Sequence, residues 1–257
     1  MSPIEPIPDE AAALVDIGAA GRALVVADYH AGIEAAIRYE QGLAVESRGA
    51  ERRERVLALL DAHAVDRVIF LGDVTHSIGQ PRRIEGDELA ALFAAITRPI
   101  TVVKGNHDGA IEDWLSNVSH RVGSITTVDA GGTVLGSVGF AHGHSWPDQA
   151  VLAADAVCIA HEHPCIRLVD EVGGHRIEPV WLRGRLDLTA IEDCTTRATS
   201  DGGGPAVVVV PAFNRIVGGT WINRDDATFL SPVLEQGFVA VEAYLLDGTR
   251  LGRLEDL

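Results

Sequence analysis

ITVVKGNHD, residues 100–108, is the stretch of the sequence that decides the fold. Its apolar, largely β-branched first half predicts a short buried strand, and Gly105 predicts a sharp turn directly after it. Asn106, His107 and Asp108 then place an amide, an imidazole and a carboxylate just beyond the strand. Open α/β sheets bind their ligands at the carboxyl ends of strands. This stretch therefore predicts an α/β protein with a polar site at one edge of a sheet.

Four other predicted strands end in the same way. Strands are expected at residues 22–28, 67–73, 137–141 and 156–160, with helices at 33–42, 52–63 and 87–96 between them. The polar residues at these strand ends are Asp28 and His30, Asp73, His142 and His144, and His161 and His163. Because the carboxyl ends of parallel strands meet at one edge, these side chains are expected to converge.

The remainder of the chain predicts shorter elements. Residues 125–128, 133–135 and 137–141 predict a hairpin meander around Gly131 and Gly132. A helix at 149–154 and strands at 165–170, 176–182 and 207–210 are expected to follow, with a polar loop insertion at 195–204. No break in composition marks a boundary, so residues 1–257 are interpreted as one domain with its motifs in 22–165.

Charge and cysteine content narrow the function class. The formal net charge is −16, and Lys104 is the single lysine. This favours a halophilic source, with an ordinary acidic protein as the alternative. The apolar runs are too short to span a membrane and the first ten residues lack a basic leader, so a soluble cytoplasmic protein is expected. Three cysteines without C-x-x-C spacing fit neither a disulfide framework nor a thiolate metal site.

The predicted polar edge has the composition of a metal centre. Seven oxygen or nitrogen donors without a thiolate suit two hard or borderline divalent ions. Manganese is the expected metal, and iron, zinc, nickel and cobalt are also compatible with this donor set.

In order, these motifs resemble those of the calcineurin-like metallophosphoesterase superfamily. The family pattern of D-x-H, G-D, G-N-H-D, a later His and G-H-x-H corresponds to Asp28 to His30, Gly72-Asp73, Gly105 to Asp108, His142 and Ala160 to His163. Ala160 stands where the family usually has Gly, and His76 stands where an acidic residue or asparagine is commoner. The resemblance implies a four-layer α/β/β/α sandwich and a metal-dependent phosphoesterase.

A finer resemblance is to the ligase-associated DNA damage response phosphoesterases and their archaeal repair-nuclease relatives. It depends on residues 71–77, 161–164, 211–213 and 218–219. It implies a phosphodiesterase or nuclease linked to DNA repair, with single-stranded DNA as a substrate and a helicase or ligase as a partner. The sequence does not determine the oligomeric state.

The resemblance also implies roles for the individual residues. Asp28, His30, Asp73 and His163 would hold one metal, and Asp73, Asn106, His142 and His161 the other, with a metal-bridging hydroxide as the nucleophile. His107 would contact the phosphate or protonate the leaving oxygen, and Asp108 would orient it. Without the motifs, Asp28 or Asp73 would be interpreted as a helix N-cap and Asn106 as a turn former.

Four further residues are weaker candidates for substrate contact. His76 and His144 lie near predicted donors, although each is equally compatible with a structural role. Arg82 and Arg83 follow the Asp73 loop and match phosphate geometry. Arg52, Arg53 and Arg55 alternate with glutamates, a pattern typical of a solvated helix face.

The sequence thus predicts phosphoester hydrolysis and leaves two alternatives open. One is a small-molecule or cyclic-nucleotide phosphodiesterase, because nothing in the motifs measures the length of the substrate. The other is a non-catalytic metal-binding scaffold of the same fold, which requires lost donors, whereas every donor is present. A structural zinc module is excluded because such sites close with four ligands, often including cysteine.

Overall fold

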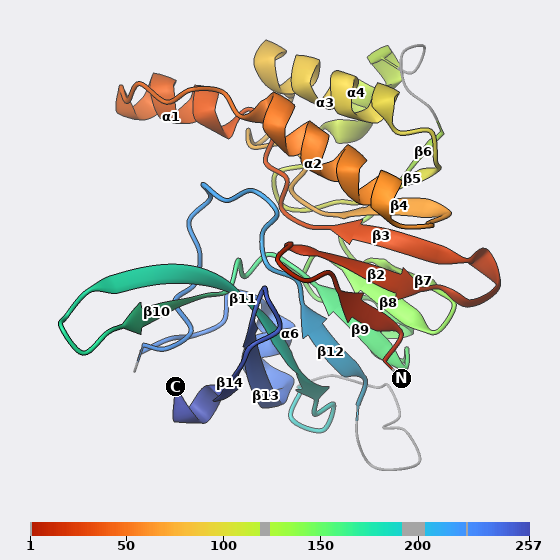
Figure 1. The fold of residues 1–257 in the computed structure, drawn as a ribbon. Coiled ribbons are helices and arrows are strands. Elements are labelled where there is room, and N and C mark those ends of the chain that lie inside the picture. Colours follow the sequence, from red (N-terminus) through yellow and green to blue (C-terminus); the bar gives the residue numbers. More distant parts are fainter. Residues whose placement is uncertain (1, 119–123, 192–203, 225) are drawn as a thin grey trace.

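Two β-sheets lie face to face in the computed structural model, which describes residues 2–118, 124–191, 204–224 and 226–257 (Figure 1). The first sheet has the strand order β1-β2-β3-β4-β5-β6. Its strands β3 to β6 are parallel, and β1 and β2 continue the sheet in antiparallel fashion. The strands are β1 (Ile4–Pro6), β2 (Ala12–Asp16), β3 (Arg22–Val26), β4 (Arg67–Leu71), β5 (Ile100–Val103) and β6 (Ile125–Val128).

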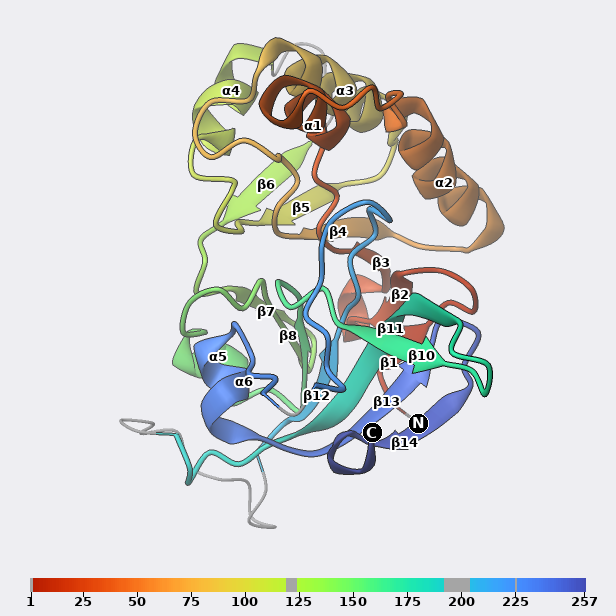
Figure 2. The same cartoon turned by 90° about the vertical axis from the view of Figure 1, so that its left-hand side faces the viewer.

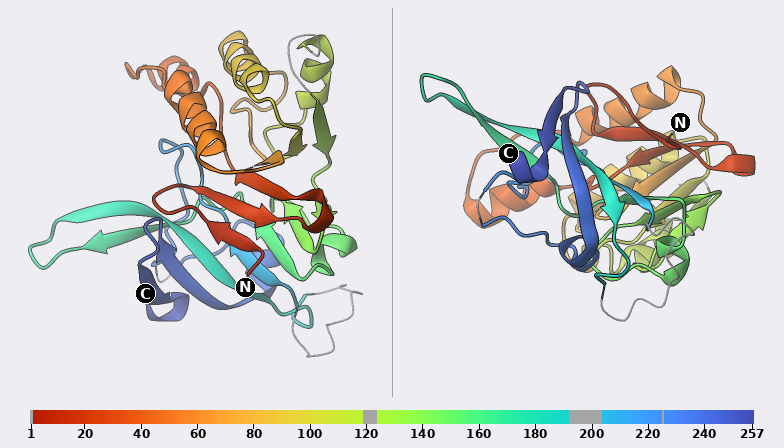
Figure 3. Two further views of the ribbon diagram at one scale, coloured as in Figure 1. Left: turned by 45° about the vertical axis from the view of Figure 1, so that its right-hand side comes forward. Right: turned by 90° about the horizontal axis from the view of Figure 1, so that it is seen from below.

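The second sheet has the order β14-β13-β11-β12-β9-β8-β7, and β10 pairs with β11. In Figure 3 the β10–β11 hairpin, in teal, extends away from the body of the molecule. The strands are β7 (Thr133–Leu135), β8 (Val138–Ala141), β9 (Ala156–Ile159), β10 (Cys165–Val169), β11 (His175–Leu186), β12 (Ala206–Val209), β13 (Phe238–Leu245) and β14 (Arg250–Arg253).

Helices cover the outer faces of both sheets (Figure 2). On the first sheet these are α1 (Ile33–Gln41), α2 (Gly49–Ala62), α3 (Arg83–Ala95) and α4 (Ile111–Val118). On the second they are α5 (Gln149–Leu152) and α6 (Pro232–Gly237). Among the described residues, no helix has the length and apolar content needed to cross a bilayer.

Apolar side chains point alternately to the two faces of the central strands, and they form three apolar layers. In β4, Val68 and Phe70 face the helices, whereas Ile69 and Leu71 face the second sheet. In β9, Cys158 faces the first sheet, and Val157 and Ile159 pack toward α5 and α6. A strand with period-two side chains buried on both faces must lie between two covering layers. The layers are therefore α/β/β/α, and the fold predicted from the sequence is confirmed.

One expectation about connectivity is wrong. Residues 125–128 do not join a meander: β6 pairs in parallel with β5 in the first sheet, and only β7 and β8 form a hairpin. The physical reason is the free edge of β5, which offers parallel backbone partners to β6. The turn at Gly131 and Gly132 then directs the chain into the second sheet, because Gly132 has a φ of +90°.

Several elements were absent from the sequence-based prediction, namely β1, β2, α4, α6, β13 and β14. The predicted loop insertion at 195–204 lies outside the described residues except for Gly204, whose N–H donates to the carbonyl of Leu186.

Candidate metal centre

The predicted donors come from the loops at the ends of strands in both sheets. Asp28 and His30 follow β3, and Asp73 follows β4. His142 follows β8, and His161 and His163 follow β9. The strand register brings them together in two groups whose donor atoms lie within 4.8 Å of one another: Asp28, His30 and His163, and Asp73, His142 and His161. Each group combines side chains from both sheets, so the centre forms only where the sheets pack together.

The Asp73 carboxylate lies between the two groups. Its Oδ2 is 3.7 Å from His30 Nε2 in the first group and 3.5 Å from His142 Nε2 in its own group. Asp28 Oδ1 is 3.1 Å from His163 Nε2 and 3.8 Å from His142 Nδ1. A carboxylate in this position can neutralise two adjacent cations at once.

An open cavity of about 320 Å³ lies over the centre. Asn106 is exposed and lines this cavity together with Asp73, His107 and His161. Its amide is therefore at the same edge as the other six predicted donors.

The donor loops have unusual backbone geometry. Five predicted donors have positive φ: Asp28 (52°), His30 (46°), Asp73 (48°), His161 (71°) and His163 (43°). The left-handed region costs a non-glycine residue of the order of 1–3 kcal/mol and persists only when surrounding contacts fix it. The loops are tied together by the Asp28 N–H donating to the Gly72 carbonyl (3.2 Å) and the His30 N–H donating to the Asp73 carbonyl (2.9 Å).

Two motif glycines allow the loops to approach this closely. A Cβ on Gly72 would lie 2.1 Å from His142 Nδ1, and a Cβ on Gly105 would lie 2.1 Å from Asp73 Oδ1. Any side chain at these positions would displace a donor. The sequence motifs G-D and G-N-H-D thus have a steric cause.

Hydrogen bonds behind the rings orient the histidines. His142 Nδ1–H donates to the Leu71 carbonyl at 3.0 Å, and His163 Nδ1–H donates to the Gly218 carbonyl at 2.8 Å. When either ring is neutral, this leaves Nε2 as a lone-pair donor that faces the centre, which is the usual arrangement of metal-binding histidines.

Buried polar atoms test whether this site fits metal ions. Among the described residues, Asp28 Oδ2, His30 Nε2 and His142 Nε2 are buried without a hydrogen-bond partner. An unpaired buried polar atom costs about 1–3 kcal/mol, and more if it is charged. One divalent cation in each donor group would satisfy these three atoms, and carboxylate, imidazole and amide donors suit such cations. The residues present therefore fit a metal centre.

The electrostatics of the metal-free centre divide the histidines into two classes. Burial disfavours the charged ring of His142, but the nearby carboxylates of Asp73 and Asp28 outweigh it and raise the pKa to about 9. Burial likewise opposes protonation of His163, yet Asp28 raises its pKa to about 9. For His30 and His161, burial dominates and lowers the pKa to about 3 and about 4. The pKa of Asp73 is well below its usual range because His142 and His30 outweigh its burial.

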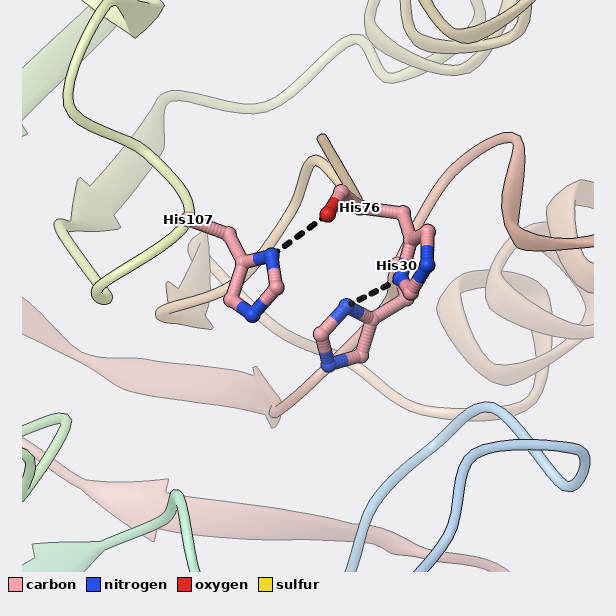
Figure 4. A group of neighbouring side chains, drawn as sticks. All are labelled: His30, His76 and His107. Atoms are coloured by element: carbon pink, nitrogen blue, oxygen red, sulfur yellow. Dashed lines mark hydrogen bonds between the residues drawn. The ribbon is translucent and has the colours of Figure 1, made fainter. Parts of the chain in front are cut away.

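His107 and His76 form the rim of the centre beside His30 (Figure 4). The His107 Nδ1–H donates to the backbone carbonyl of His76, and His107 Nε2 lies 3.9 Å from Asp73 Oδ2. The His76 and His107 rings stack at 5.7 Å, and Nδ1 of His76 lies 3.4 Å from Nδ1 of His30. The side chain of His107 is 22% exposed, so it can reach a substrate in the cavity.

The predicted contact between Asp108 and the His107 ring is wrong. Asp108 is fully buried and accepts hydrogen bonds from the N–H groups of Val74 (3.3 Å), Thr75 (3.1 Å) and Gly105 (3.0 Å). Burial and the nearby Asp73 raise its pKa. Asp108 therefore fastens the Asp73 loop to the His107 loop, and the His76 carbonyl is the group that orients the His107 ring.

His144 lies beside the second group of donors. Its ring is 5.3 Å from that of His142 and 6.0 Å from that of His161. Burial and the neighbouring His142 lower its pKa. This position agrees with the expectation that His144 lies near the centre.

Of the two arginine clusters, the one on α2 differs from expectation, and substrate contact by the other stays a prediction. Arg82 is exposed, 3.8 Å from Glu40, with its guanidinium 5.6 Å from the centre of the Tyr39 ring, and Arg83 pairs with Asp87 on α3. Arg52, expected on a solvated helix face, is instead buried between Glu34 and Glu88. Arg55 packs on the Phe213 ring at 4.1 Å. Helical periodicity alone did not show that α2 lies between two other elements.

Two buried residues near the centre were missed by the sequence analysis. Asn214 Nδ2–H donates to the carbonyls of Tyr29 and His30, and Glu162 accepts from the N–H groups of Leu230 and Ser231. Glu162 lies within the H-E-H stretch, so its place between two donors was a usable signal. No such signal in the sequence marks Asn214, because its partners are about 185 residues away along the chain.

Comparison with known proteins places this geometry in a family. The family model described as calcineurin-like phosphoesterase matches residues 21–165, more than half of the chain. The chain belongs to the calcineurin-like phosphoesterase family. It is therefore a metal-dependent phosphoesterase, as the sequence predicted.

A structural comparison supports the same fold. The crystal structure of the Pseudomonas putida nuclease MPE is similar over 96% of this chain and 100% of that chain, with a TM-score of 0.55 and 18% sequence identity. No curated protein gives a significant match.

Proposed function

We propose that this phosphoesterase is a two-metal phosphodiesterase that cleaves nucleic acid. The observation that carries the proposal is the pair of donor groups sharing the Asp73 carboxylate, each with buried donor atoms that lack a partner among the described residues. The non-catalytic scaffold is disfavoured because the complete predicted donor set reaches one edge of the fold.

The residues divide between two metal positions. Asp28, His30 and His163 would hold one ion, and His142, His161 and Asn106 the other, with Asp73 shared. Two bound divalent ions would supply an acidified water as the nucleophile and would neutralise charge on the phosphate. Manganese is the proposed native metal, because oxygen and imidazole donors without thiolate suit it.

His107 is the proposed general acid. Its Nδ1 is held by the His76 carbonyl, which leaves Nε2 at the cavity over the centre. A proton on Nε2 would reach the leaving oxygen, and the same N–H would stabilise charge on the phosphate.

A nuclease is the favoured activity. The structural neighbour from Pseudomonas putida is a nuclease, and the cavity over the centre is open rather than closed around a small ligand. Arg82, exposed and 3.8 Å from Glu40, is the proposed phosphate contact, with Arg83 beside it. A role in DNA repair with a helicase or ligase partner belongs to the same proposal.

Leaving-group dependence tests this function. The wild-type chain, freed of metal by chelation and reloaded with Mn²⁺, is expected to hydrolyse bis-p-nitrophenyl phosphate and single-stranded DNA. His107→Ala is expected to keep its metal content and to lose roughly 10²–10⁴-fold in turnover of DNA, but far less with p-nitrophenolate, which needs no protonation. Equal losses for both substrates would remove the general-acid role, and full activity of metal-free protein would refute the function.

A further inference from the structure

A second cavity, of about 700 Å³, opens beside the metal centre on the side of His163. It shares His163, Gly218 and Gly219 with the cavity over the centre. Its other lining residues come mainly from the segment after β12 and the β10–β11 hairpin, and the rest from the β1–β2 loop, α2 and the end of β13. Arg82 and Arg83 are not among its lining residues, so it leads away from the centre on a different flank.

The segment that floors this cavity, residues 213–221, is here called the platform loop. Figure 2 shows it in blue, rising from β12 toward the first sheet. At one end, the N–H groups of Phe213 and Asn214 donate to the carbonyls of Ala27 (2.9 Å) and Asp28 (3.3 Å). At the other end, the Thr220 N–H donates to the Glu162 carbonyl at 3.2 Å. The platform loop is thus fastened to both donor loops of the first metal position.

Gly219 shows how closely the platform loop approaches the centre. A Cβ at Gly219 would lie 2.2 Å from the His163 carbonyl oxygen, whereas a Cβ at Gly218 would meet nothing within 4 Å. The Gly218 carbonyl accepts the hydrogen bond of His163 Nδ1. The backbone of this loop is therefore fixed relative to the candidate metal centre.

Two side chains of the platform loop suit a nucleic acid strand. Arg215 is exposed, lines the cavity and has no ion-pair or hydrogen-bond partner among the described residues. Trp221 lines the same cavity and is partly exposed. A guanidinium binds phosphate, and an indole provides a stacking surface for any base.

The other charges around the cavity offset one another. Arg55 pairs with Glu10, and Arg176 lies 3.3 Å from Glu178. Asp9 and Asp247 also line the wall. The cavity is therefore not a broadly basic surface, and in a chain of net charge −16 it cannot attract phosphates from a distance. Binding here has to come from short-range contacts.

We infer that this cavity binds the strand of a single-stranded nucleic acid next to the scissile phosphate, with Arg215 on a neighbouring phosphate and Trp221 stacked on a base. The inference rests on the proposed function and deepens it. A diester without flanking nucleotides would reach neither side chain. The cavity therefore favours an extended substrate over a small one.

The test compares an extended substrate with a small one in the Mn²⁺-loaded full chain. Arg215→Gln and Trp221→Ala are each expected to lower kcat/KM for a single-stranded DNA oligonucleotide by roughly tenfold or more. Hydrolysis of bis-p-nitrophenyl phosphate is expected to stay within twofold. Trp221→Tyr keeps an aromatic face and is expected to recover most of the loss. Arg250 is an exposed arginine of β14 that pairs with Glu242. Arg250→Gln is the control for loss of one positive charge.

A second measurement keeps the inference falsifiable if Trp221→Ala folds poorly. Titrating the wild-type chain with a phosphorothioate oligonucleotide is expected to quench tryptophan fluorescence, and Trp221→Tyr is expected to remove most of that quenching. Repeating the assay with an RNA strand of the same sequence distinguishes DNA from RNA as the substrate. The nucleic acid that the wild type cleaves is expected to show the selective loss in the variants. Equal losses on both substrates, or none, would overturn the inference and leave the proposed function intact. Failure of the wild type on every diester would instead refute the proposed function.

Discussion

Two clusters of buried charge in this protein differ in how their polar atoms are satisfied. At the metal centre, donor atoms of Asp28, His30 and His142 are buried without hydrogen-bond partners among the described residues. Between α1, α2 and α3, Arg52 donates to both Glu34 and Glu88, and Glu88 also accepts from the Gly32 N–H. Both clusters are buried, but in the described part of the chain only the second has hydrogen-bond partners for its charged groups.

Backbone geometry separates the same two clusters. Five of the metal donors have left-handed backbone, whereas Glu34, Arg52 and Glu88 belong to regular helices. Strain and unpaired atoms occur together at the metal centre, as expected where a site is built to bind something. A buried ion cluster that satisfies itself on unstrained helices holds elements together instead. The predictions below test this difference.

The largest expected effect is at the metal centre. Asp73→Asn removes the carboxylate that lies between the donor groups, so it is expected to lose bound metal and about 10⁴-fold or more of turnover. The metal-free protein is also expected to be less stable, because the lowered pKa of Asp73 means that its ionised carboxylate stabilises the fold. Elemental analysis measures the metal content, and urea unfolding measures the stability. Full metal content with full activity would contradict the assignment.

A variant of the helix cluster is expected to lose stability without losing metal. Arg52→Met leaves Glu34 and Glu88 buried without their cation, at a cost of about 3–5 kcal/mol in the free energy of unfolding. Metal content and turnover of the folded fraction are expected to stay near wild type. Adding Glu34→Gln and Glu88→Gln should recover much of the stability, since no unpaired charge remains. A large loss of metal in Arg52→Met would mean that the two clusters are not independent.

Proton release on metal binding is the third expected difference. The pKa values of about 9 for His142 and His163 in the metal-free protein mean that both rings are protonated at pH 7. Their protonation stabilises the metal-free fold below pH 6.5, and this contribution is lost as the pH rises through 9. Metal requires neutral rings, so affinity should rise about tenfold per pH unit for each released proton between pH 6.5 and 9. Calorimetry in two buffers of different ionisation enthalpy counts the protons, and a pH-independent affinity would contradict the prediction.

The helix cluster has the opposite pH dependence. Burial opposes the charge of Glu34, but its hydrogen bonds and ion pair with Arg52 outweigh this and lower its pKa below 4.5. The stability that Glu34 contributes is therefore present above pH 4.5 and is lost as the pH falls through its folded-state pKa. Acid unfolding of wild type and Glu34→Gln should converge at low pH.

The smallest expected effect compares two neighbouring glycines. Gly219→Ala forces its Cβ against the His163 carbonyl, and is expected to weaken metal binding and to cost about 1–3 kcal/mol in stability. Gly218→Ala has open space and is expected to stay within about 0.5 kcal/mol of wild type. Thermal unfolding with and without Mn²⁺ measures both. Equal effects would show that the platform loop does not constrain His163.

The sequence by itself determined the fold class and the set of candidate donors. Buried strands that end in D-x-H, G-D and G-N-H-D carry local signals, because hydrophobic alternation and turn glycines are encoded within a few residues. The predicted donors converge in the structure for the same reason: the carboxyl ends of parallel strands share an edge. Gly72 and Gly105 add a steric requirement that is also local.

Only the tertiary structure decided which sheet each strand joins and which charges are buried. β6 pairs with the free edge of β5. Arg52 is enclosed by α1 and α3, and the sequence of α2 does not show that these helices lie against it. Asp108 bonds to backbone groups of another loop rather than to its neighbour His107. Asn214 is held beside the centre by a contact across about 185 residues, and the next residue, Arg215, lines the neighbouring cavity. Such contacts form where separate layers pack, and no short window of sequence specifies them.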